Sequence, residues 1–497
     1  MATTAPTAEA PPPARPPRKA RYAVAPCALP LLGHALPLAR RPLDFLTGLS
    51  RHGDLVEVRL GRRPAVMVCD PGLIRQVLLE ARTYDKGGPL FDKAEELVGS
   101  GLFSATFEPH RRQRRMMQPG FHQSRMPGYA AVMEQEIAEL LQGWRDGQEL
   151  DVRDQMHAVT LRIAARTMFT NPLSTRATAE VQECMPLINR GVYKRMVAPT
   201  ALLEKLPTRE NREFALAHER MRVVVDQAIT QYRSEGIDHG DLMSILISTV
   251  DEETGQGLSE EEIHKQVTTL LAGGMETTAN AICSALHLID GHPQVRRRVR
   301  QELDRVLAGR PARFEDVPRL EYLYRVLYET LRLRPPVWLL TRVTTRDAEL
   351  GGHRLPEGRI ILLSPYLLHH NPDLFARPEN FDPDRWLPER VDDVTRAAMQ
   401  PFIMGNRKCI GDKFALTEAT LLIATILGAW SMRPVAGTRR KHLPEATLGP
   451  GPLPMRLTRR QPATEDTAVD VTDSPREAAA TRPDPSTGSC PYRGDQS

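Results

Sequence analysis

Cysteine is scarce in this chain, and its few copies are far apart. There are six cysteines among 497 residues, and no two of them form a C-x-x-C pair. Zinc sites, iron–sulfur clusters and disulfide-rich domains depend on closely spaced cysteines, so this spacing argues against all three. The cytosol is the simplest location for such a chain. The cysteines are Cys27, Cys69, Cys184, Cys283, Cys409 and Cys490.

Long apolar runs are also missing near the N-terminus. Residues 1–25 contain Pro-Pro-Pro and Arg-Pro-Pro-Arg-Lys, and the later segment Leu29–Leu38 is interrupted by Pro30, Gly33 and Pro37. A membrane-spanning helix needs about 20 consecutive apolar residues, and a secretory signal also needs an unbroken apolar stretch. We therefore expect no membrane span, a cytoplasmic protein and a disordered N-terminus at residues 1–25.

A strong charge of one sign is absent as well. The formal net charge is +4, and a field this weak gives no indication of a nucleic-acid partner. No repeat, linker or change of composition divides residues 40–455, so we expect one domain at residues 26–460. Residues 461–497 have almost no large apolar side chains. They cannot bury enough surface to offset the entropy of ordering, which predicts a disordered tail.

Periodic patterns predict a domain that is mainly α with a minor β-sheet. Strand-like alternation is confined to a hairpin at Leu55–Leu60 and Ala65–Cys69 and to a strand at Arg359–Leu363. Helical spacing of apolar residues is more widespread. The expected helices are Pro71–Glu80, Met126–Arg145, Arg153–Met168, Glu210–Tyr232, Val295–Leu307 and Tyr322–Leu333.

One cysteine lies in surroundings that suit a metal-binding thiolate. Cys409 follows Gly405 and Arg407 and precedes Gly411, after which apolar residues recur at helical spacing. Gly405 can turn the backbone with positive φ, and Gly411 lets the helix approach closely. Backbone N–H groups at the start of that helix can point at the sulfur and stabilise its negative charge. A buried structural cysteine is the alternative.

The spacing Phe402-x-x-Gly405-x-Arg407-x-Cys409-x-Gly411 resembles the haem-binding loop of the cytochrome P-450 family. The resemblance implies that haem b is the cofactor, with Cys409 as the axial thiolate of its iron and Phe402 beside it. It also implies the family fold, in which a long central helix lies over the haem and the Cys loop lies on the proximal side. Met404 departs from the pattern, which more often has a small residue there.

A long helix is predicted from Ser259 to Gly291. Ser259 and Glu262 can form a capping box, and Gly291 is followed shortly by Pro293. The adjacent glycines 273 and 274 should each cost about 1 kcal/mol relative to alanine in a helix interior. A local widening, where a ligand approaches the backbone, would explain that cost, and a simple packing notch between helices is the alternative.

The two residues after Met275 resemble the oxygen-binding groove of P-450 enzymes. The motif is Ala-Gly-Gly-Met-Glu-Thr-Thr at residues 272–278. The resemblance implies that Glu276 and Thr277 relay protons during catalysis and that Gly274 faces the cofactor. An ordinary helix-interior threonine is the alternative for Thr277.

Glu329 and Arg332 stand three residues apart on a predicted helix and can pair. Exposed pairs of this kind contribute little stability. In the P-450 family an arginine at the position of Arg385 completes a buried Glu-Arg-Arg network that fixes the segment leading to the Cys loop. Buried charges are tolerable only when all are paired, so these three residues are predicted to be structural.

Cations are implied at the haem propionates. His110 and Arg114 lie four residues apart in a basic run that resembles the family helix with propionate contacts, and Arg342 and Arg407 are the further expected partners. The planar fork of arginine binds carboxylates in bidentate fashion.

The resemblance implies a monooxygenase that uses dioxygen and electrons from a separate partner. A ferredoxin and a ferredoxin reductase are expected, because nothing in the chain resembles a flavin or iron–sulfur site, and we expect a monomer. Four cations near Cys409 would suit an acidic partner. Two other uses of the same iron are a peroxide-driven peroxygenase and an isomerase or dehydratase, while a haem sensor without turnover belongs to another class. The four cations are Arg111, Arg112, Lys408 and Lys413.

The expected substrate is a compact hydrocarbon. The residues predicted to line its pocket are apolar, and none is a charged anchor for a carboxylate or an amine. Segments 30–35, 52–61 and 84–88 resemble bacterial P-450 enzymes that oxidise sesquiterpenes in antibiotic pathways. A cyclic terpene is therefore expected, and a fatty acid or polyketide is the alternative. The predicted lining residues are Phe91, Leu270, Met275, Val337, Trp338 and Leu339.

Overall fold

The computed structural model describes residues 19–61, 63–88, 91–92, 95, 99–169, 174–197, 206–436, 442–444 and 447–460. The predicted C-terminal tail, residues 461–497, lies outside these ranges, and so do residues 1–18. Strand β1 (Tyr22–Val24) falls within the predicted disordered N-terminus and pairs with β2 (Leu55–Leu60). The domain therefore begins before residue 26, and the predicted boundary is corrected accordingly.

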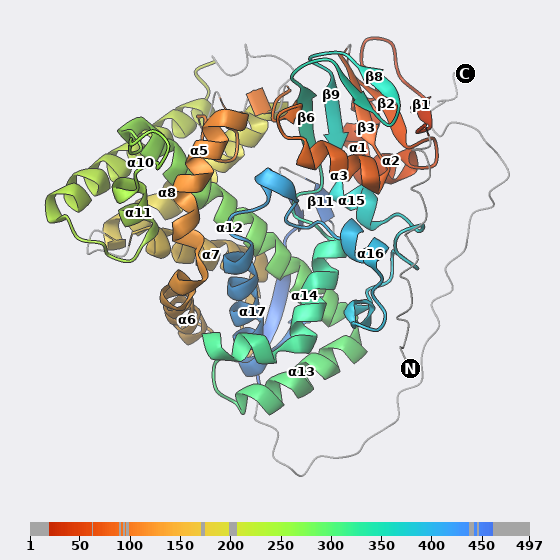
Figure 1. Cartoon of the computed structure of the whole chain (residues 1–497). Helices are drawn as coiled ribbons and strands as arrows, with labels where there is room; N and C mark the ends of the chain where they lie inside the picture. The colour runs from red at the N-terminus through yellow and green to blue at the C-terminus, as the bar shows by residue number, and fades with distance from the viewer. Residues whose placement is uncertain are drawn as a thin grey trace, which may run out of the picture.

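A six-stranded sheet lies at one end of the molecule, at the top of Figure 1. Its strand order is β1-β2-β3-β9-β6-β4. The predicted hairpin is confirmed as β2 and β3 (Arg63–Val68), and the predicted strand as β9 (Ile360–Leu363), which runs parallel to β3. The remaining strands are β4 (Tyr84–Asp85), β5 (Glu149–Asp151), β6 (Leu340–Thr344), β7 (Ala348–Leu350), β8 (His353–Leu355), β10 (Trp430–Pro434), β11 (His442–Pro444), β12 (Leu448–Pro450) and β13 (Pro454–Arg459).

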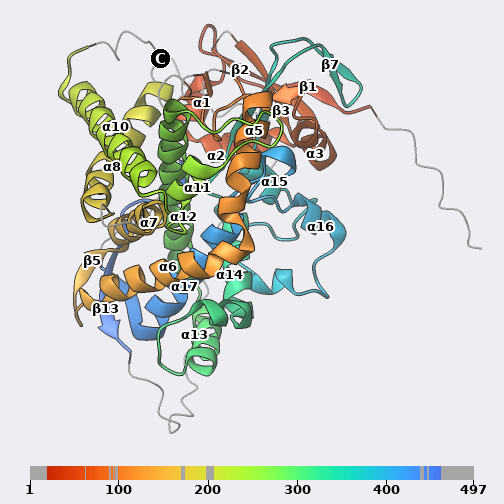
Figure 2. The same ribbon diagram turned by 60° about the vertical axis from the view of Figure 1, so that its left-hand side comes forward.

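Helices form most of the rest, which confirms a mainly α fold with a minor sheet. Helix α12 (Glu260–Gly291) runs through the middle of the helical part in both Figure 1 and Figure 2. The other helices are α1 (Ala35–Arg40), α2 (Pro42–Leu49), α3 (Pro71–Leu79), α5 (Phe107–Met117), α6 (Met126–Gln142), α7 (Val152–Met168), α8 (Ser174–Val197), α10 (Arg209–Glu235), α11 (Leu242–Ser248), α13 (Pro293–Leu307), α14 (Glu321–Leu333), α15 (Pro365–His369), α16 (Asp393–Ala398) and α17 (Asp412–Ala429).

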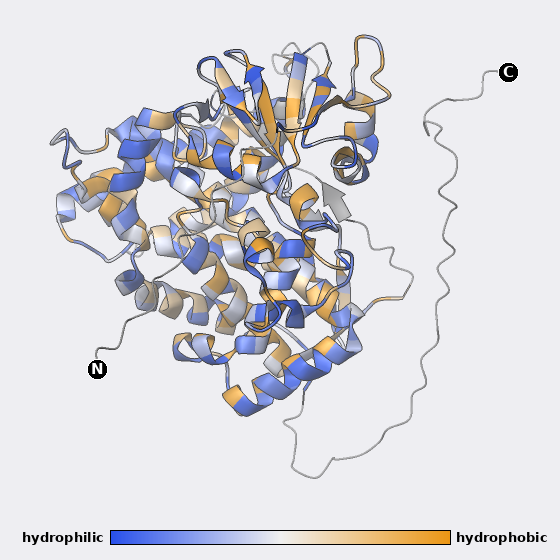
Figure 3. Cartoon of the chain, turned by 45° about the vertical axis from the view of Figure 1, so that its right-hand side comes forward, coloured by the Kyte–Doolittle hydropathy of each residue, from blue (hydrophilic) through white to orange (hydrophobic). Residues whose placement is uncertain are grey.

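Three apolar clusters hold these elements together. The largest joins α6, α7, α12, α14 and α17. The other two cover opposite faces of the six-stranded sheet, with Val66 and Val68 on one face and Ala65 and Met67 on the other. This is the alternation expected of strands buried on both sides. Figure 3 shows hydrophobic and hydrophilic residues alternating along the helices, as expected of helices that bury one face.

Helix α12 begins and ends as the sequence predicts. The Ser259 side chain and the Glu262 side chain form a reciprocal capping box, and the helix stops at Gly291. The helix continues without interruption through Gly273 and Gly274, so the predicted widening of its backbone is absent. A Cβ added at Gly273 would have no neighbouring atom within 4 Å, whereas one at Gly274 would lie 3.8 Å from the Ala164 Cβ on α7. The open space therefore lies beside Gly273, outside the helix.

The buried network around Glu329 is present. The Arg332 guanidinium donates to both carboxylate oxygens of Glu329, at 2.8 and 2.9 Å, and Arg385 Nε lies 3.4 Å from Oε1. Trp386, which the sequence did not single out, donates from its indole nitrogen to Oε2 at 2.9 Å. Removing one partner of such a buried pair typically costs about 3–5 kcal/mol.

His369 connects this network to the Cys loop. Its Nε2 accepts a hydrogen bond from the Gln400 backbone N–H at 3.1 Å, and its Nδ1 lies 3.2 Å from the Arg332 carbonyl oxygen. Nδ1 must therefore carry the proton, which makes the ring neutral. Burial lowers the pKa of His369 to about 3, with smaller contributions from His370 and Arg332. The network thus fixes the chain at Gln400, directly before the loop that carries Cys409.

Candidate functional site

The loop that carries Cys409 is a tight turn between α16 and α17. Gly405 has φ +70°, and a Cβ at this position would lie 2.6 Å from the Leu78 carbonyl oxygen, so the turn requires glycine. Gly411 has φ −98° and would tolerate a Cβ, so the predicted close approach at that position is absent. The Cys409 N–H donates to the Phe402 carbonyl oxygen at 2.9 Å and closes the loop.

The Cys409 thiol is exposed, whereas Cys69, Cys184 and Cys283 are buried. Although part of Cys409 is exposed, desolvation by the surrounding protein raises the pKa of its thiol, and the Gly411 backbone N–H partly offsets that rise by hydrogen bonding to the sulfur. The charges of Arg114 and Lys408 act in the same direction as Gly411, while Asp412 opposes them. The thiol is therefore accessible to a ligand, and backbone and cationic groups stabilise its ionised form.

Cationic side chains converge beside this loop. His110 is 4% exposed, and its pKa falls to about 2. Burial is the largest cause, and the charges of Arg407, Lys86, Arg114 and Arg342 lower it further. The structure thus brings together the four predicted propionate partners, of which three are arginines and His110 is neutral, and it adds Lys86.

Little negative charge balances the cluster. The Arg342 guanidinium is buried, and its pKa is lowered to about 10 by burial and then by Arg407. Asp85 is the acidic partner of Arg407. Burial lowers the pKa of Lys86 well below its usual value, and Arg407 and Arg342 lower it further. Burying cations without matching anions is costly, so this arrangement indicates an anionic ligand.

The cluster fits the two propionates of the haem that the sequence implies. The Arg407 Nε is buried without a hydrogen-bond partner, which leaves a donor for a carboxylate. Arg114 donates to the Lys408 carbonyl oxygen and to Gln118 Oε1, so it lies against the Cys loop. Lys86 escaped the sequence analysis because a lone lysine has no distinctive spacing. Its signal was its place next to the buried strand β4.

On α12, the residues predicted to relay protons lie on different sides of the helix. The Thr277 hydroxyl donates to the Gly273 carbonyl oxygen at 2.6 Å, along the side that has open space. Glu276 accepts a hydrogen bond from the Thr447 hydroxyl at 2.6 Å. Thr447 lies just before β12 and was not singled out from the sequence. Gly274 faces Ala164 on α7 instead of the open side, which corrects its predicted contact with the cofactor.

The predicted apolar lining is only partly supported. Leu270 shares the side of α12 with Gly273 and is partly exposed, and Val337, Trp338 and Leu339 are also partly exposed. Met275 is 3% exposed and packs in the main core, so the structure gives no support to its predicted role as a lining residue, which stays a prediction. Phe91 is buried against the Phe103 ring, with centroids 5.3 Å apart. Apolar residues that line a pocket and apolar residues of the core have the same helical spacing. The sequence therefore could not tell which of Leu270 and Met275 faces the pocket.

The cations expected to attract an acidic partner are largely neutralised. Arg111 pairs with Glu253 at 2.7 Å, and Arg112 pairs with Glu262 at 2.6 Å. Lys408 pairs with Asp412 four residues later at 2.6 Å, and Lys413 lies 3.3 Å from a glutamine oxygen. Three of the four side chains are therefore paired with carboxylates, while the charge of Lys413 stays unbalanced.

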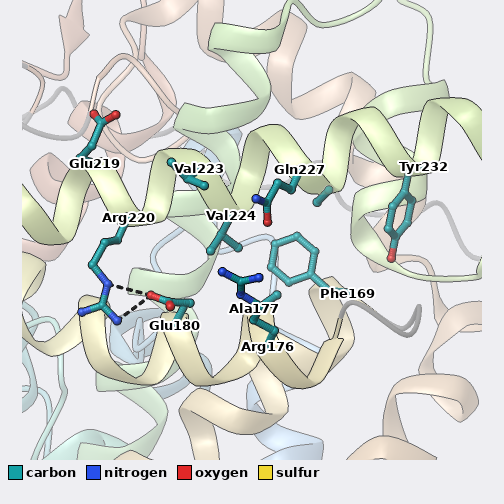
Figure 4. Close-up of a pocket in the computed structure, with 11 residues that line it drawn as sticks. Phe169, Arg176, Ala177, Glu180, Glu219, Arg220, Val223, Val224, Gln227 and Tyr232 are labelled. Carbon is teal, nitrogen blue, oxygen red and sulfur yellow. Dashed lines mark hydrogen bonds and ion pairs between the residues drawn. The ribbon is translucent and has the colours of Figure 1, made fainter.

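A separate pocket of about 210 Å³ lies between α8 and α10 (Figure 4). The Arg220–Glu180 ion pair bridges the two helices at one end, and Phe169 and Tyr232 lie at the other. None of the predicted site residues lines this pocket.

The described residues lack two further features, a metal-binding cluster and a membrane-spanning helix. Within the described ranges, no group of three or more His, Cys, Asp or Glu side chains could hold a metal ion. No helix in the described part of the chain is both long and apolar enough to cross a membrane.

Comparison with known proteins places the chain among described relatives. The family profile described as "Cytochrome P450" matches residues 25–458. Cyclooctatin synthase of Streptomyces melanosporofaciens is 49% identical over 88% of this chain and 95% of its own. Cyclooctat-9-en-7-ol 5-monooxygenase of the same organism is 47% identical over 87% and 94%. Pentalenene oxygenase of Streptomyces avermitilis is 39% identical over 88% and 97%.

A solved structure agrees with these relatives. The crystal structure of the cytochrome P450DA heme domain superimposes with a TM-score of 0.80 and 28% sequence identity. The match covers 90% of this chain and 99% of that one.

Proposed function

The chain belongs to the cytochrome P450 family of haem-thiolate monooxygenases, and from this premise we propose that it oxidises a compact, apolar cyclic terpene. The similarity to three Streptomyces terpene-modifying enzymes, at 39–49% identity over nearly the whole domain, carries the proposal. The most fitting setting is bacterial secondary metabolism, including the making of antibiotics.

The cofactor-binding part of the proposal follows from the site. Cys409 would hold the haem iron, with Phe402 packed beside it, and His110, Arg114, Arg342, Arg407 and Lys86 would hold the propionates. When bound, haem supplies oxygen activation, in which one atom of O₂ enters a C–H bond of the substrate and the other leaves as water with two electrons and two protons. Arg407 Nε is the donor most directly available to a propionate, because it has no hydrogen-bond partner among the residues that the structure describes.

Thr277 and Glu276 are the groups that we assign to proton delivery. The Thr277 hydroxyl lies beside the open space at Gly273 and has one proton, which it currently donates to the Gly273 carbonyl oxygen. Rotation about χ1 would let the hydroxyl pass that proton to a group in the open space. The Glu276 carboxylate is adjacent in sequence. After taking up a proton from solvent water, it would act as the general acid that restores the Thr277 proton.

Substrate positioning would come from shape and desolvation. Leu270, Val337, Trp338 and Leu339 offer apolar surface with no charged anchor. A fatty acid would need a cation for its carboxylate, and residues 273–278 of α12 contain none. We therefore place Leu270 and residues 337–339 around the substrate, with Phe91 as a further contact.

Electrons would come from a ferredoxin and its reductase. We also propose that the enzyme works as a monomer in the cytoplasm, where reduced electron carriers are available. The neutralised cations near Cys409 make shape complementarity more important for docking than net charge.

A titration of the haem-loaded protein tests the proposed substrate. Cyclic diterpenes and sesquiterpenes, fatty acids and polyketide macrolactones are added while the low-spin to high-spin absorbance change is recorded. The proposal expects a saturable change with at least one cyclic terpene and none with the others. A change with fatty acids or macrolactones, and none with any terpene, would contradict it.

A further inference from the structure

A hydrogen-bonded chain of side chains from three elements ends on Glu276. Thr447 Oγ1 lies 2.6 Å from Glu276 Oε1, and Asn280 Nδ2 lies 2.8 Å from Thr447 Oγ1. His157 Nε2, on α7, lies 3.2 Å from Asn280 Oδ1. The chain therefore links α7, α12 and the hairpin formed by β11 and β12.

The direction of each hydrogen bond is fixed by the chemistry of the groups. An ionised carboxylate only accepts, so the single proton of the Thr447 hydroxyl is donated to Glu276. That hydroxyl must then accept from Asn280, which requires the amide nitrogen to face it and leaves the amide oxygen facing His157. His157 donates from Nε2 to that oxygen. Every donor in the chain therefore points toward Glu276.

This polarity has a mechanistic consequence. To relay a proton, the Asn280 amide would have to release a proton from its nitrogen while its oxygen takes one up. Amides do not readily do this, so Asn280 blocks proton transfer along the chain. The chain cannot serve as a proton wire from His157 to Glu276. It can orient the Glu276 carboxylate and stabilise its ionised form, because hydrogen bonds to a charged acceptor are about twice as strong as neutral ones.

The hairpin is built to place Thr447 at this point. The Leu448 N–H donates to the Pro336 carbonyl oxygen at 2.8 Å, which ties β12 to the segment that precedes Val337. A Cβ at Gly449 would lie 2.4 Å from Asn280 Cγ and Oδ1, so glycine is required for β12 to lie this close to α12. The position of Thr447 is therefore fixed by the hydrogen bond of Leu448 to Pro336 and by the close approach of Gly449 to Asn280.

We infer that Thr447 is a positioning residue, which with Asn280 holds the Glu276 carboxylate in the orientation used for proton delivery. This inference rests on the proposed function, in which Glu276 and Thr277 deliver protons. Loss of the Thr447 hydroxyl should therefore appear as uncoupling, in which electrons from the donor reduce dioxygen to hydrogen peroxide instead of forming product.

The decisive variant is Thr447→Val, which keeps the shape of the side chain and removes its proton. Thr447→Ser keeps the hydroxyl and is the rescue. Thr160→Val is the matched control, because Thr160 also donates to α12, but to the Met275 backbone carbonyl at 3.1 Å instead of a carboxylate. Thr160 is buried and Thr447 is half-buried. The haem-loaded proteins are compared for product formed per electron donor consumed and for peroxide released.

We expect Thr447→Val to lower the coupling ratio about tenfold, as expected when a hydrogen bond to a charged group is lost. Thr447→Ser should restore most of it, and Thr160→Val should stay near the wild-type value. Turnover driven by added hydrogen peroxide, which already carries both protons, should be unchanged in Thr447→Val. A crystal structure of this variant should show the Glu276 carboxylate displaced from its wild-type position.

Two results would overturn the inference. One is wild-type coupling in Thr447→Val with Glu276 unmoved, and the other is a folded Thr447→Ser that fails to rescue. The variants Glu276→Gln and Thr277→Ala show whether such a result concerns only Thr447 or the proposed function as a whole. If they uncouple the enzyme and Thr447→Val does not, only the role of Thr447 is wrong. If they leave coupling intact, the assignment of proton delivery itself is wrong.

Discussion

At the scale of single residues, the cations beside Cys409 are the most unusual feature of the site. Arg342 and Arg407 are buried, His110 is held neutral, and Lys86 is pressed toward its neutral form. Asp85 is the nearby acidic group and cannot balance them all. The protein alone is therefore strained by like charges at this point, and an anionic ligand would relieve the strain.

Lys86→Met should have opposite effects on the protein with and without haem. Without haem, it removes one buried cation from the cluster, so the free energy of unfolding should rise by about 1 kcal/mol. With haem, it removes a propionate partner, so haem should dissociate roughly tenfold faster. Chemical denaturation of the haem-free protein and transfer of haem to apomyoglobin measure the two effects.

Lys413→Met is the control for this experiment, because Lys413 is exposed and lies outside the cluster. It should change neither quantity. Destabilisation of the haem-free Lys86→Met protein would show that the cluster is not strained and that Lys86 is a structural residue.

Residue-level prediction from sequence succeeded where a motif fixed the spacing. The Gly405 turn and the Glu329 network were found because their spacing is distinctive. The ligand role of Cys409, which rests on the same loop motif, stays a prediction. The structure does not support the roles predicted for Met275 and Gly274, because which side of a helix faces a cavity depends on how neighbouring helices pack. Lys86, His369 and Thr447 were missed, since their roles arise from contacts between segments far apart in the chain.

At the scale of elements, α12 is the scaffold on which the distal side of the site depends. The sequence predicted both of its ends, because capping and stop signals are local. It also predicted a local widening at Gly273 and Gly274, and this was wrong. Hydrogen bonds within a 32-residue helix are satisfied without a break, so the two glycines open space beside the helix instead of within it.

Gly273→Ala and Gly274→Ala should therefore separate stability from substrate binding. Both add a methyl group that meets no tight contact in the protein, so each should stabilise the helix by up to about 1 kcal/mol. Only the methyl group at position 273 enters the open space beside Thr277. Gly273→Ala should thus weaken binding of the best terpene found in the titration, while Gly274→Ala should leave it unchanged.

Thermal unfolding and the spin-state titration check both parts. Equal weakening of binding by the two variants would contradict the assignment of the open side of α12 to Gly273.

At the scale of the whole molecule, helices and sheet are held together by a buried polar network as well as by apolar packing. The mainly α fold could be predicted from apolar periodicity, and most helix bounds agree within a few residues. The order of strands in the sheet could not, since β3 pairs with β9 across about 300 residues of chain. Such long-range pairing leaves no local pattern in the sequence.

The network makes stability depend on pH in a definite direction. Burial lowers the pKa of both His369 and His370 to about 3, below the ordinary value of 6.5. Above pH 6.5 both rings are neutral in the folded and unfolded chains and contribute no pH dependence. Below it the unfolded chain binds two protons that the folded chain refuses, so stability should fall by roughly 1.4 kcal/mol per pH unit for each histidine, down to about pH 3.

Urea denaturation at pH 7.5, 6.0 and 5.0 measures this slope. His110, whose pKa is lowered to about 2, adds to the slope in the same way. His370→Phe should therefore reduce the slope by no more than about a third while leaving the link between His369 and Gln400 in place. A free energy of unfolding that stays level from pH 6.5 to 5.0 would contradict the neutral state of both rings.

The most direct test of the account concerns the ligand of the haem iron. The wild-type protein, reduced with dithionite and exposed to carbon monoxide, should show the long-wavelength Soret band of a thiolate–haem complex. Cys409→Ser should lose this band, while Cys184→Ala and Cys283→Ala, which change buried cysteines, should keep it. Survival of the band in Cys409→Ser would show that Cys409 is not the ligand and would contradict the account.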